Sequence, residues 1–310
     1  MTFEIESIKY KVGEKSISVR QICLDKGRDF ERLLLRSGFE TVHRTSEPDT
    51  TFFGDFLDKN LEIREKEYLI LVNQSMASLI PGKVSKLFSG RDDARTTGFL
   101  EISDGCTGFA RALVVANSIL ESGLASRLHI VCAEKYSQYY DDDDDSVSPI
   151  FSDAISVTTL TNQGRNRVIG SKFLNFFDKS EAISVCQNST GIDKIRMEGA
   201  RVLTWAIREI PKVVFDLLAE SGLSIDQVNS WYVHQGSKIV VDSLLETLGV
   251  DPTGKFTSSQ LGNTVSSTIP ITLSDEQVHH GNQFIPKGYA VFLGFGVGLS
   301  IVAVLLEVMD

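Results

Sequence analysis

The sequence contains the same order of predicted elements twice. In each copy a short apolar strand is followed by a helix, a polar turn, a second extended segment and a Gly-x-Thr loop that opens another helix. The first copy uses Leu69–Ser75, Phe99–Ser103 and Gly105-Cys106-Thr107; the second uses Trp231–Ser237, Lys255–Ser258 and Gly262-Asn263-Thr264. Two strand–helix–strand–helix units predict an α/β fold in which helices cover a parallel sheet. We expect one half at residues 1–165 and the other at 166–310.

Three polar residues fall where strands of this predicted sheet end. Cys106 and Asn263 occupy corresponding places in the two Gly-x-Thr loops, and His234 directly follows an apolar strand. Ligands of open α/β sheets bind beyond the carboxyl ends of the strands. The duplication therefore predicts that Cys106, His234 and Asn263 converge.

A strand pair is also predicted between the two copies. Ile155–Leu160 and Val168–Leu174 alternate apolar and polar residues on either side of a turn at Asn162–Asn166. Alternation on both sides of a short turn is typical of an antiparallel hairpin.

Cys106 lies where an extended segment turns into a helix. The unpaired N–H groups and partial positive charge of a helix N-terminus favour the thiolate and a more reactive sulfur. The alternative is a buried thiol that packs as a small apolar group. We expect the other three cysteines to be packing thiols: Cys23, Cys132 and Cys186.

Cysteine, histidine and asparagine together suit acyl transfer from a thioester. The cysteine attacks the thioester and carries the acyl group. The imidazole and the amide then donate hydrogen bonds to a developing oxyanion, such as the enolate left when a malonyl thioester loses CO₂. Papain-like proteases use the same residue types, but their local signature is absent here.

Composition excludes several other classes. The 310 residues carry a net charge of −10, which argues against general nucleic-acid binding. No apolar run reaches the roughly 18 residues of a membrane span, and the N-terminus lacks the form of a signal peptide. The four cysteines are scattered, as expected for free thiols in a reducing cytoplasm.

Two further motifs have ordinary explanations. The run Asp141–Asp145 is expected to be an exposed acidic loop, because calcium loops space their ligands at alternate positions. Gly294–Gly298 resembles a nucleotide-binding glycine loop, but a strand and no helix follows it. We expect no metal site.

The motifs of the chain resemble the β-ketoacyl-acyl-carrier-protein synthase III group of the thiolase superfamily. They occur in the family's order: Asp104–Gly108, Phe151-Ser152-Asp153, Met197-Glu198-Gly199, Val233-His234-Gln235, Gly262-Asn263-Thr264 and Gly294–Gly298. The resemblance implies a five-layered αβαβα fold with duplicated halves and a homodimer. It implies that Cys106 is acylated, with His234 and Asn263 supporting decarboxylative condensation.

The resemblance also implies subsidiary sites. The backbone N–H groups of Cys106 and Val297 would form the oxyanion hole for the thioester. The acyl pocket would be lined by Ile150, Phe151 and Phe295, with Ile80 reaching into the partner's pocket. Arg36, Gly236 and Ser237 would lie at the entrance for a carrier or pantetheine arm.

The chain departs from the family at the coenzyme A clamp. Arg32 replaces the adenine-stacking tryptophan, Asp145 replaces an arginine, and Ala200 replaces an asparagine. We therefore expect an acyl thioester donor presented by a carrier protein or another group, with acyl-CoA or acyl-carrier protein as substrates and no separate cofactor.

Three functions follow. The first is a 3-oxoacyl-ACP synthase III-like condensing enzyme in fatty-acid or secondary-metabolite biosynthesis. The second is an acyltransferase of the same fold that passes the acyl group to a hydroxyl or amine of a sugar or secondary metabolite. The third is a non-catalytic partner subunit of a heteromeric synthase.

Overall fold

The chain folds around a mixed nine-stranded sheet with the order β11-β12-β13-β8-β1-β7-β6-β4-β5. The computed structural model describes residues 2–77, 80–141, 144, 147–187, 193–277 and 283–310. The strands of the sheet are β1 (Phe3–Val12), β4 (Tyr68–Val72), β5 (Gly98–Ile102), β6 (Arg127–Glu134), β7 (Ala154–Asn162), β8 (Asn166–Asn175), β11 (Val228–Val233), β12 (Gly288–Gly296) and β13 (Ser300–Val308). Its two halves meet at a single pair, Phe3 with Asn166.

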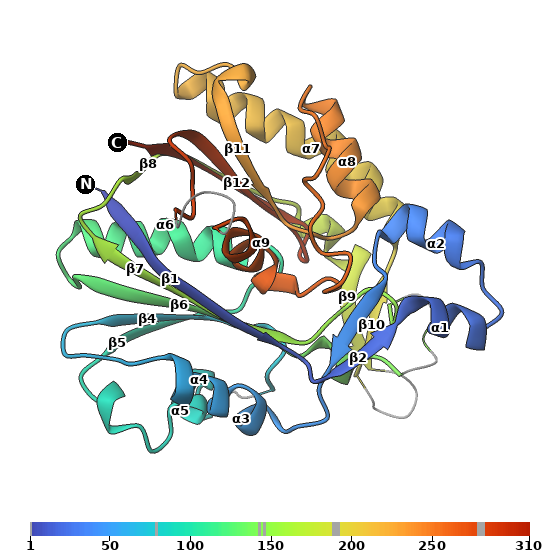
Figure 1. Cartoon of the computed structure of the whole chain (residues 1–310), viewed down its shortest axis with the longest axis horizontal. Coiled ribbons are helices and arrows are strands. Elements are labelled where there is room, and N and C mark those ends of the chain that lie inside the picture. Colours follow the sequence, from blue (N-terminus) through green and yellow to red (C-terminus); the bar gives the residue numbers. More distant parts are fainter. Residues whose placement is uncertain (1, 78–79, 142–143, 145–146, 188–192, 278–282) are drawn as a thin grey trace.

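Helices lie on both faces of each half, which confirms the expected five-layered αβαβα arrangement. Figure 1 shows α6 and α9 in the middle, between the β5-β4-β6-β7-β1 half and the β11-β12-β13-β8 half. The central helices are α6 (Gly108–Glu121) and α9 (Thr268–Gln277). The outer helices are α3 (Asp49–Phe52), α4 (Gly54–Asn60) and α5 (Lys83–Leu87) on the first half, and α7 (Gly199–Glu220) and α8 (Lys238–Thr247) on the second.

The strands are buried on both faces, as their continuous apolar sequences predict. In β4, Leu69 and Leu71 pack under the outer helices α3–α5, whereas Ile70 and Val72 pack against α6. In β13, alternate residues likewise divide between the outer and central clusters. Side chains of a strand point alternately to opposite faces, so a continuous apolar run supplies two cores.

The two halves repeat the same strand pattern, except that β5 has no counterpart among the described strands of the second half. In the first half β4 pairs in parallel with β6 and β5, and β7 and β1 follow antiparallel. In the second half β11 pairs in parallel with β12, and β13 and β8 follow antiparallel. The expected strand at Lys255–Ser258 is wrong, because this segment is irregular and β11 forms the sheet edge.

The predicted hairpin is also wrong. Both strands exist, as β7 and β8, but β1 lies between them and pairs with both. The N-terminal strand completes both halves in this way. A local alternation pattern cannot reveal an insertion from a distant part of the chain.

Smaller elements cover one end of the sheet. They lie together at one side of Figure 1, next to the end of β11. They are α1 (Val19–Asp25), α2 (Phe30–Ser37), the pair β2 (Lys15–Ser18) and β3 (Thr41–Arg44), and the pair β9 (Ile183–Gln187) and β10 (Asp193–Met197). Within the described residues, no helix is both long and apolar enough to cross a membrane.

Candidate active site

Cys106 lies in the turn between β5 and α6, against the end of β12. Its side chain is buried, with 6% of its surface exposed. Gly296 adopts φ 151°, and a Cβ added there would lie 3.0 Å from the Cys106 Sγ. A glycine is therefore needed for the β12 backbone to approach the sulfur this closely.

Burial decides the ionisation of this thiol. It raises the pKa of Cys106 to about 12, assisted by the charges of Asp104 and Glu134, while hydrogen bonds from the backbone of Val297 and of Cys106 itself act in the opposite direction. Loss of water from the buried sulfur thus opposes the thiolate that a helix N-terminus favours. A thiol with this pKa loses its proton as it reacts.

His234 follows the last residue of β11. Its backbone N–H donates to the Leu293 carbonyl on β12 (2.9 Å), and its ring meets the edge of Phe295 with centroids 5.5 Å apart. Burial lowers the pKa of His234 to about 3. The imidazole is therefore neutral at pH 7, with one protonated and one bare nitrogen.

Thr268, on α9, contacts the inner nitrogen of this ring. Its Oγ1 lies 2.8 Å from His234 Nδ1 and 3.1 Å from the Val265 carbonyl oxygen. A hydroxyl has one proton to donate. When the hydroxyl donates to the Val265 carbonyl, it accepts from Nδ1–H and Nε2 carries no proton. When it donates to Nδ1 instead, the proton of the imidazole stands on Nε2, the nitrogen available to the site.

Asn263 is held in the loop that precedes α9. Its backbone N–H donates to the Ile150 carbonyl (2.8 Å), and its carbonyl accepts from the Ser152 N–H (2.9 Å). Its side-chain Oδ1 accepts from the Val265 N–H at 2.9 Å. Because the oxygen is engaged, the amide nitrogen is the side-chain atom available as a donor.

Val265 and the end of β12 connect the three residues. Val265 hydrogen-bonds with Asn263, and its Cγ1 would lie 3.3 Å from a Cβ added at Gly105, the neighbour of Cys106. On β12, Phe295 packs on His234 and the adjacent Gly296 packs on Cys106. Residues 106, 234 and 263 therefore share one buried site at the carboxyl end of the strands.

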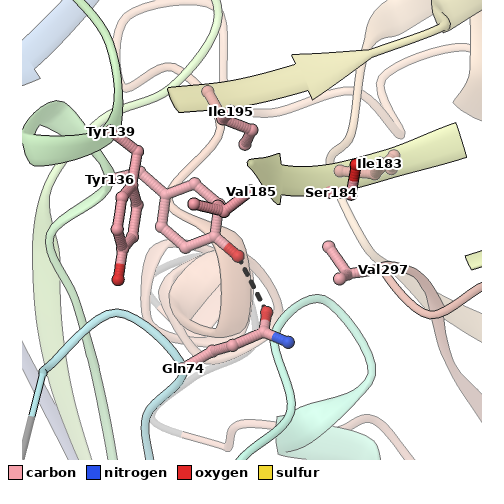
Figure 2. Close-up of a pocket in the computed structure, with 8 residues that line it drawn as sticks. All are labelled: Gln74, Tyr136, Tyr139, Ile183, Ser184, Val185, Ile195 and Val297. Carbon is pink, nitrogen blue, oxygen red and sulfur yellow. Dashed lines mark hydrogen bonds between the residues drawn. The ribbon is translucent and has the colours of Figure 1, made fainter. Parts of the chain in front are cut away.

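A pocket of about 210 Å³ lies beside Val297 (Figure 2). It is lined by Gln74, Tyr136, Tyr139, Ile183, Ser184, Val185, Ile195 and Val297. The sequence missed most of this lining, because β9 and β10 approach the site only in the folded chain. Gln74 and Tyr136 carry a detectable signal, since each closely follows the end of an apolar strand.

None of the four expected acyl-pocket residues lines this pocket. Phe151 contacts a residue that lines the pocket, because its ring centroid lies 5.1 Å from that of Tyr136. Phe295 packs on His234. Ile150 is partly buried among apolar residues, and Ile80 is 95% exposed. The structure thus places Phe151, Phe295 and Ile150 around the site and leaves Ile80 at the surface of the chain.

The three expected entrance residues lie on neighbouring elements. Arg36 is exposed in the last turn of α2, and Ser237 is the residue before α8. Gly236 lies beside His234, since a Cβ added there would be 3.4 Å from the ring.

Only Asp141 and Asp144 of the aspartate run belong to the described residues. Among the described residues, no cluster of acidic, histidine and cysteine side chains suits a metal.

Glu134 is a buried carboxyl group that the sequence analysis did not identify. It ends β6 and accepts hydrogen bonds from the backbone N–H groups of Gln74 (3.0 Å) and Ser75 (3.1 Å). Burial raises the pKa of Glu134 to about 8. The carboxyl group therefore fixes the loop after β4 against the site.

Two family models match the chain. The model described as 3-oxoacyl-[acyl-carrier-protein] synthase III matches residues 100–175, and its C-terminal companion matches residues 218–308. Together they span more than half of the sequence, and the matched segments contain Cys106, His234, Asn263 and Val297.

Curated relatives and solved structures are similar along nearly the whole chain. The β-ketoacyl-[acyl-carrier-protein] synthase III of Streptococcus uberis is 27% identical, covering 78% of this chain and 77% of the relative. That of Lactococcus lactis subsp. cremoris strain SK11 is 24% identical, covering 97% and 98%. The crystal structure of the Aquifex aeolicus synthase III superposes with a TM-score of 0.85 at 22% identity, covering 98% of this chain and 99% of the other.

Proposed function

The chain belongs to the 3-oxoacyl-[acyl-carrier-protein] synthase III family, and we propose that Cys106 carries its acyl group. The observation that supports this role is the buried thiol packed against Gly296 and Val297, next to an apolar pocket. In the first step the sulfur of Cys106 bonds to the thioester carbonyl carbon. The bond from that carbon to the donor's sulfur breaks, and the Cys106 proton passes to the departing thiol.

The tetrahedral intermediate of this step requires donors for its oxygen. The backbone of Val297 and of Cys106 already hydrogen-bonds the thiol, so both N–H groups are close to the reacting sulfur. They form the oxyanion hole of the proposal. Since the pKa of Cys106 is raised to about 12, the transfer of its proton to the departing sulfur accompanies attack.

The second step is decarboxylative condensation with a malonyl-type thioester. Loss of CO₂ leaves an enolate, whose oxygen accepts from His234 Nε2–H and from the amide of Asn263. The enolate carbon attacks the acyl carbon, the bond to Cys106 breaks, and the 3-oxoacyl thioester leaves. The Cys106 sulfur departs as a thiolate and takes a proton from solvent, which restores the thiol. The substrates supply the carbon and the driving force, so the proposed reaction uses no separate cofactor.

Product analysis tests this proposal. The protein is incubated with an acyl thioester and a malonyl thioester, and CO₂ release and the 3-oxoacyl product are measured. We expect Cys106→Ala to abolish both acylation and product formation. Cys23→Ala is the matched control, because this cysteine is buried in the cluster of α1 and α2 away from the site.

The same assay separates the two other functions. An ester or amide product without CO₂ release from malonyl thioester identifies an acyltransferase. Absence of Cys106 acylation with every thioester contradicts both enzymes and leaves a non-catalytic partner subunit.

We also propose that two copies of the chain associate through β5. This strand forms one of the two sheet edges, and its Phe99 is 53% exposed. Ile80, between β4 and α5, is 95% exposed. An exposed apolar edge strand is a ready template for pairing with another chain. In this dimer Ile80 would approach the partner's pocket, and sedimentation equilibrium of the wild type and of Phe99→Lys tests the association.

The acyl donor that we propose is a thioester on a carrier protein. Arg36 and Lys238 are exposed on α2 and α8 near Ser237, which suits the acidic surface of a carrier protein. Comparison of Cys106 acylation by acetyl-CoA and by acetyl-carrier protein tests it. Equal rates would contradict carrier selection without contradicting acylation.

A further inference from the structure

The pocket beside Val297 has apolar walls and one polar corner. Ile183, Val185 and Ile195 contribute hydrocarbon, whereas Gln74 and Tyr136 face each other with their polar ends. The Tyr136 hydroxyl donates to the Gln74 Oε1 at 2.9 Å, the dashed line in Figure 2. Tyr136 is buried, so this pair forms a fixed polar group inside the pocket.

The polar corner lies next to the proposed nucleophile. A Cβ added at Gly105 would be 2.7 Å from the Gln74 Oε1 and 3.2 Å from the Tyr136 hydroxyl. Gly105 is the residue before Cys106. A group bound to Cys106 and lying in the pocket therefore passes this corner within its first few atoms.

The side-chain nitrogen of Gln74 has no partner among the described residues. The hydrogen bonds of this residue are those from its backbone to Glu134 and the one that Oε1 accepts from Tyr136. Figure 2 shows the nitrogen turned away from Tyr136, on the side of Val297. It can donate to an oxygen that enters the pocket.

Both members of the pair are held in place. The Gln74 N–H donates to the buried carboxyl group of Glu134, and the neighbouring Asn73 hydrogen-bonds to the Ala133 carbonyl. The Tyr136 ring packs on Phe151 and, at 6.0 Å, edge-on with Tyr139. A positioned donor of this kind discriminates among ligands more strongly than an apolar wall does.

From this corner we infer that the pocket selects a short acyl group that carries an oxygen acceptor, a hydroxyl or carbonyl, a few atoms from the thioester. The inference rests on the proposed acylation of Cys106. At about 210 Å³ the pocket is small, which favours a short group over a long chain. A plain alkyl chain would cover the Gln74 donor without replacing its bond to water, which is unfavourable.

The experiment measures the rate of Cys106 acylation by intact-mass spectrometry. The probes are N-acetylcysteamine thioesters of butyrate, 3-hydroxybutyrate, 3-oxobutyrate and octanoate, which remove any contribution of the carrier. In the wild type we expect either oxygenated thioester to react at least about tenfold faster than butyrate, and octanoate to react slowest.

Two variants remove the polar corner in different ways. Gln74→Leu eliminates the donor, and we expect the preference to fall to about twofold or to reverse. Tyr136→Phe keeps the ring and removes the hydroxyl that orients Gln74, so we expect a smaller loss of preference. Gln163→Leu is the matched control, because Gln163 follows the far end of β7.

The outcomes distinguish the inference from the proposed function. If butyrate reacts as fast as the oxygenated thioesters in the wild type, or if both variants keep the preference, the inference is wrong while acylation stands. If no thioester acylates Cys106, the proposed function fails and the inference fails with it.

Discussion

The two Gly-x-Thr loops occupy equivalent places in the two halves, yet they are built differently. In the first, Gly105 has ordinary backbone angles and faces the polar ends of Gln74 and Tyr136. In the second, Gly262 has φ 70°, and a Cβ added there would meet the Ser152 Oγ first and lie 3.2 Å from the Ile150 carbonyl oxygen. One loop borders a pocket, whereas the other is held at Asn263 by backbone hydrogen bonds to Ile150 and Ser152.

The difference separates two tasks. The Cys106 loop borders the pocket beside Val297, which gives space to a group on its sulfur. The Asn263 loop fixes an amide in one orientation, through bonds to Ile150, Ser152 and Val265. A duplicated scaffold thus presents the site of the proposed covalent intermediate together with a fixed donor.

The largest expected effect comes from a variant that alters only the Asn263 loop. Asn263→Ala removes one enolate donor, so condensation should fall by about 10²–10³-fold. Cys106 acylation should stay within a few-fold, because the thioester oxygen uses Val297 and Cys106. Single-turnover measurement of each step checks this, and equal loss in both steps would show that Asn263 acts in acylation or in folding.

The two glycines test the difference between the loops. Gly262→Ala should destabilise the protein by about 2–3 kcal/mol, because it places a Cβ in a left-handed conformation against the Ser152 side chain. Gly105→Ala should cost about 1 kcal/mol, since its backbone angles suit alanine and the added Cβ opposes only the polar ends of Gln74 and Tyr136. Urea denaturation measures both, and a Gly105 variant that is as unstable as the Gly262 variant would contradict the distinction.

The pH dependence of alkylation tests whether burial controls the ionisation of Cys106. The folded pKa of about 12 lies above the range studied, so the thiolate fraction should rise about tenfold per pH unit from pH 7 to 9.5. Iodoacetamide labelling of Cys106, followed by mass spectrometry with Cys106→Ala as blank, measures it. A plateau above about pH 7 would indicate a stabilised thiolate and contradict the dominance of burial.

The smallest expected effect concerns Thr268, the hydrogen-bond partner of His234 in the second half. Thr268→Val keeps the shape but removes the hydroxyl near His234 Nδ1, so condensation should fall by about tenfold. Thr268→Ser should restore most of the rate because it keeps the hydroxyl. A serine variant as slow as the valine variant would show that Thr268 acts through packing alone.

Much of the fold was predictable from local sequence. The strands β4, β5, β6 and β11 and the helix after Cys106 lie where apolar runs and helical spacing place them. The irregularity of the second copy was not visible in the sequence: Lys255–Ser258 has extended composition but pairs with no strand of the described residues. Strand formation depends on pairing partners, which local pattern does not specify.

The sequence by itself identified the residues that we propose to carry the chemistry: a cysteine, a histidine and an asparagine at strand ends of a duplicated sheet. The tertiary structure decided their state and their surroundings. It buries Cys106 so that the thiol is favoured, neutralises His234, inserts β1 between β7 and β8 and brings β9, β10, Gln74 and Tyr136 around the pocket. Burial and long-range pairing arise from contacts between distant segments, and these exist only in the folded chain.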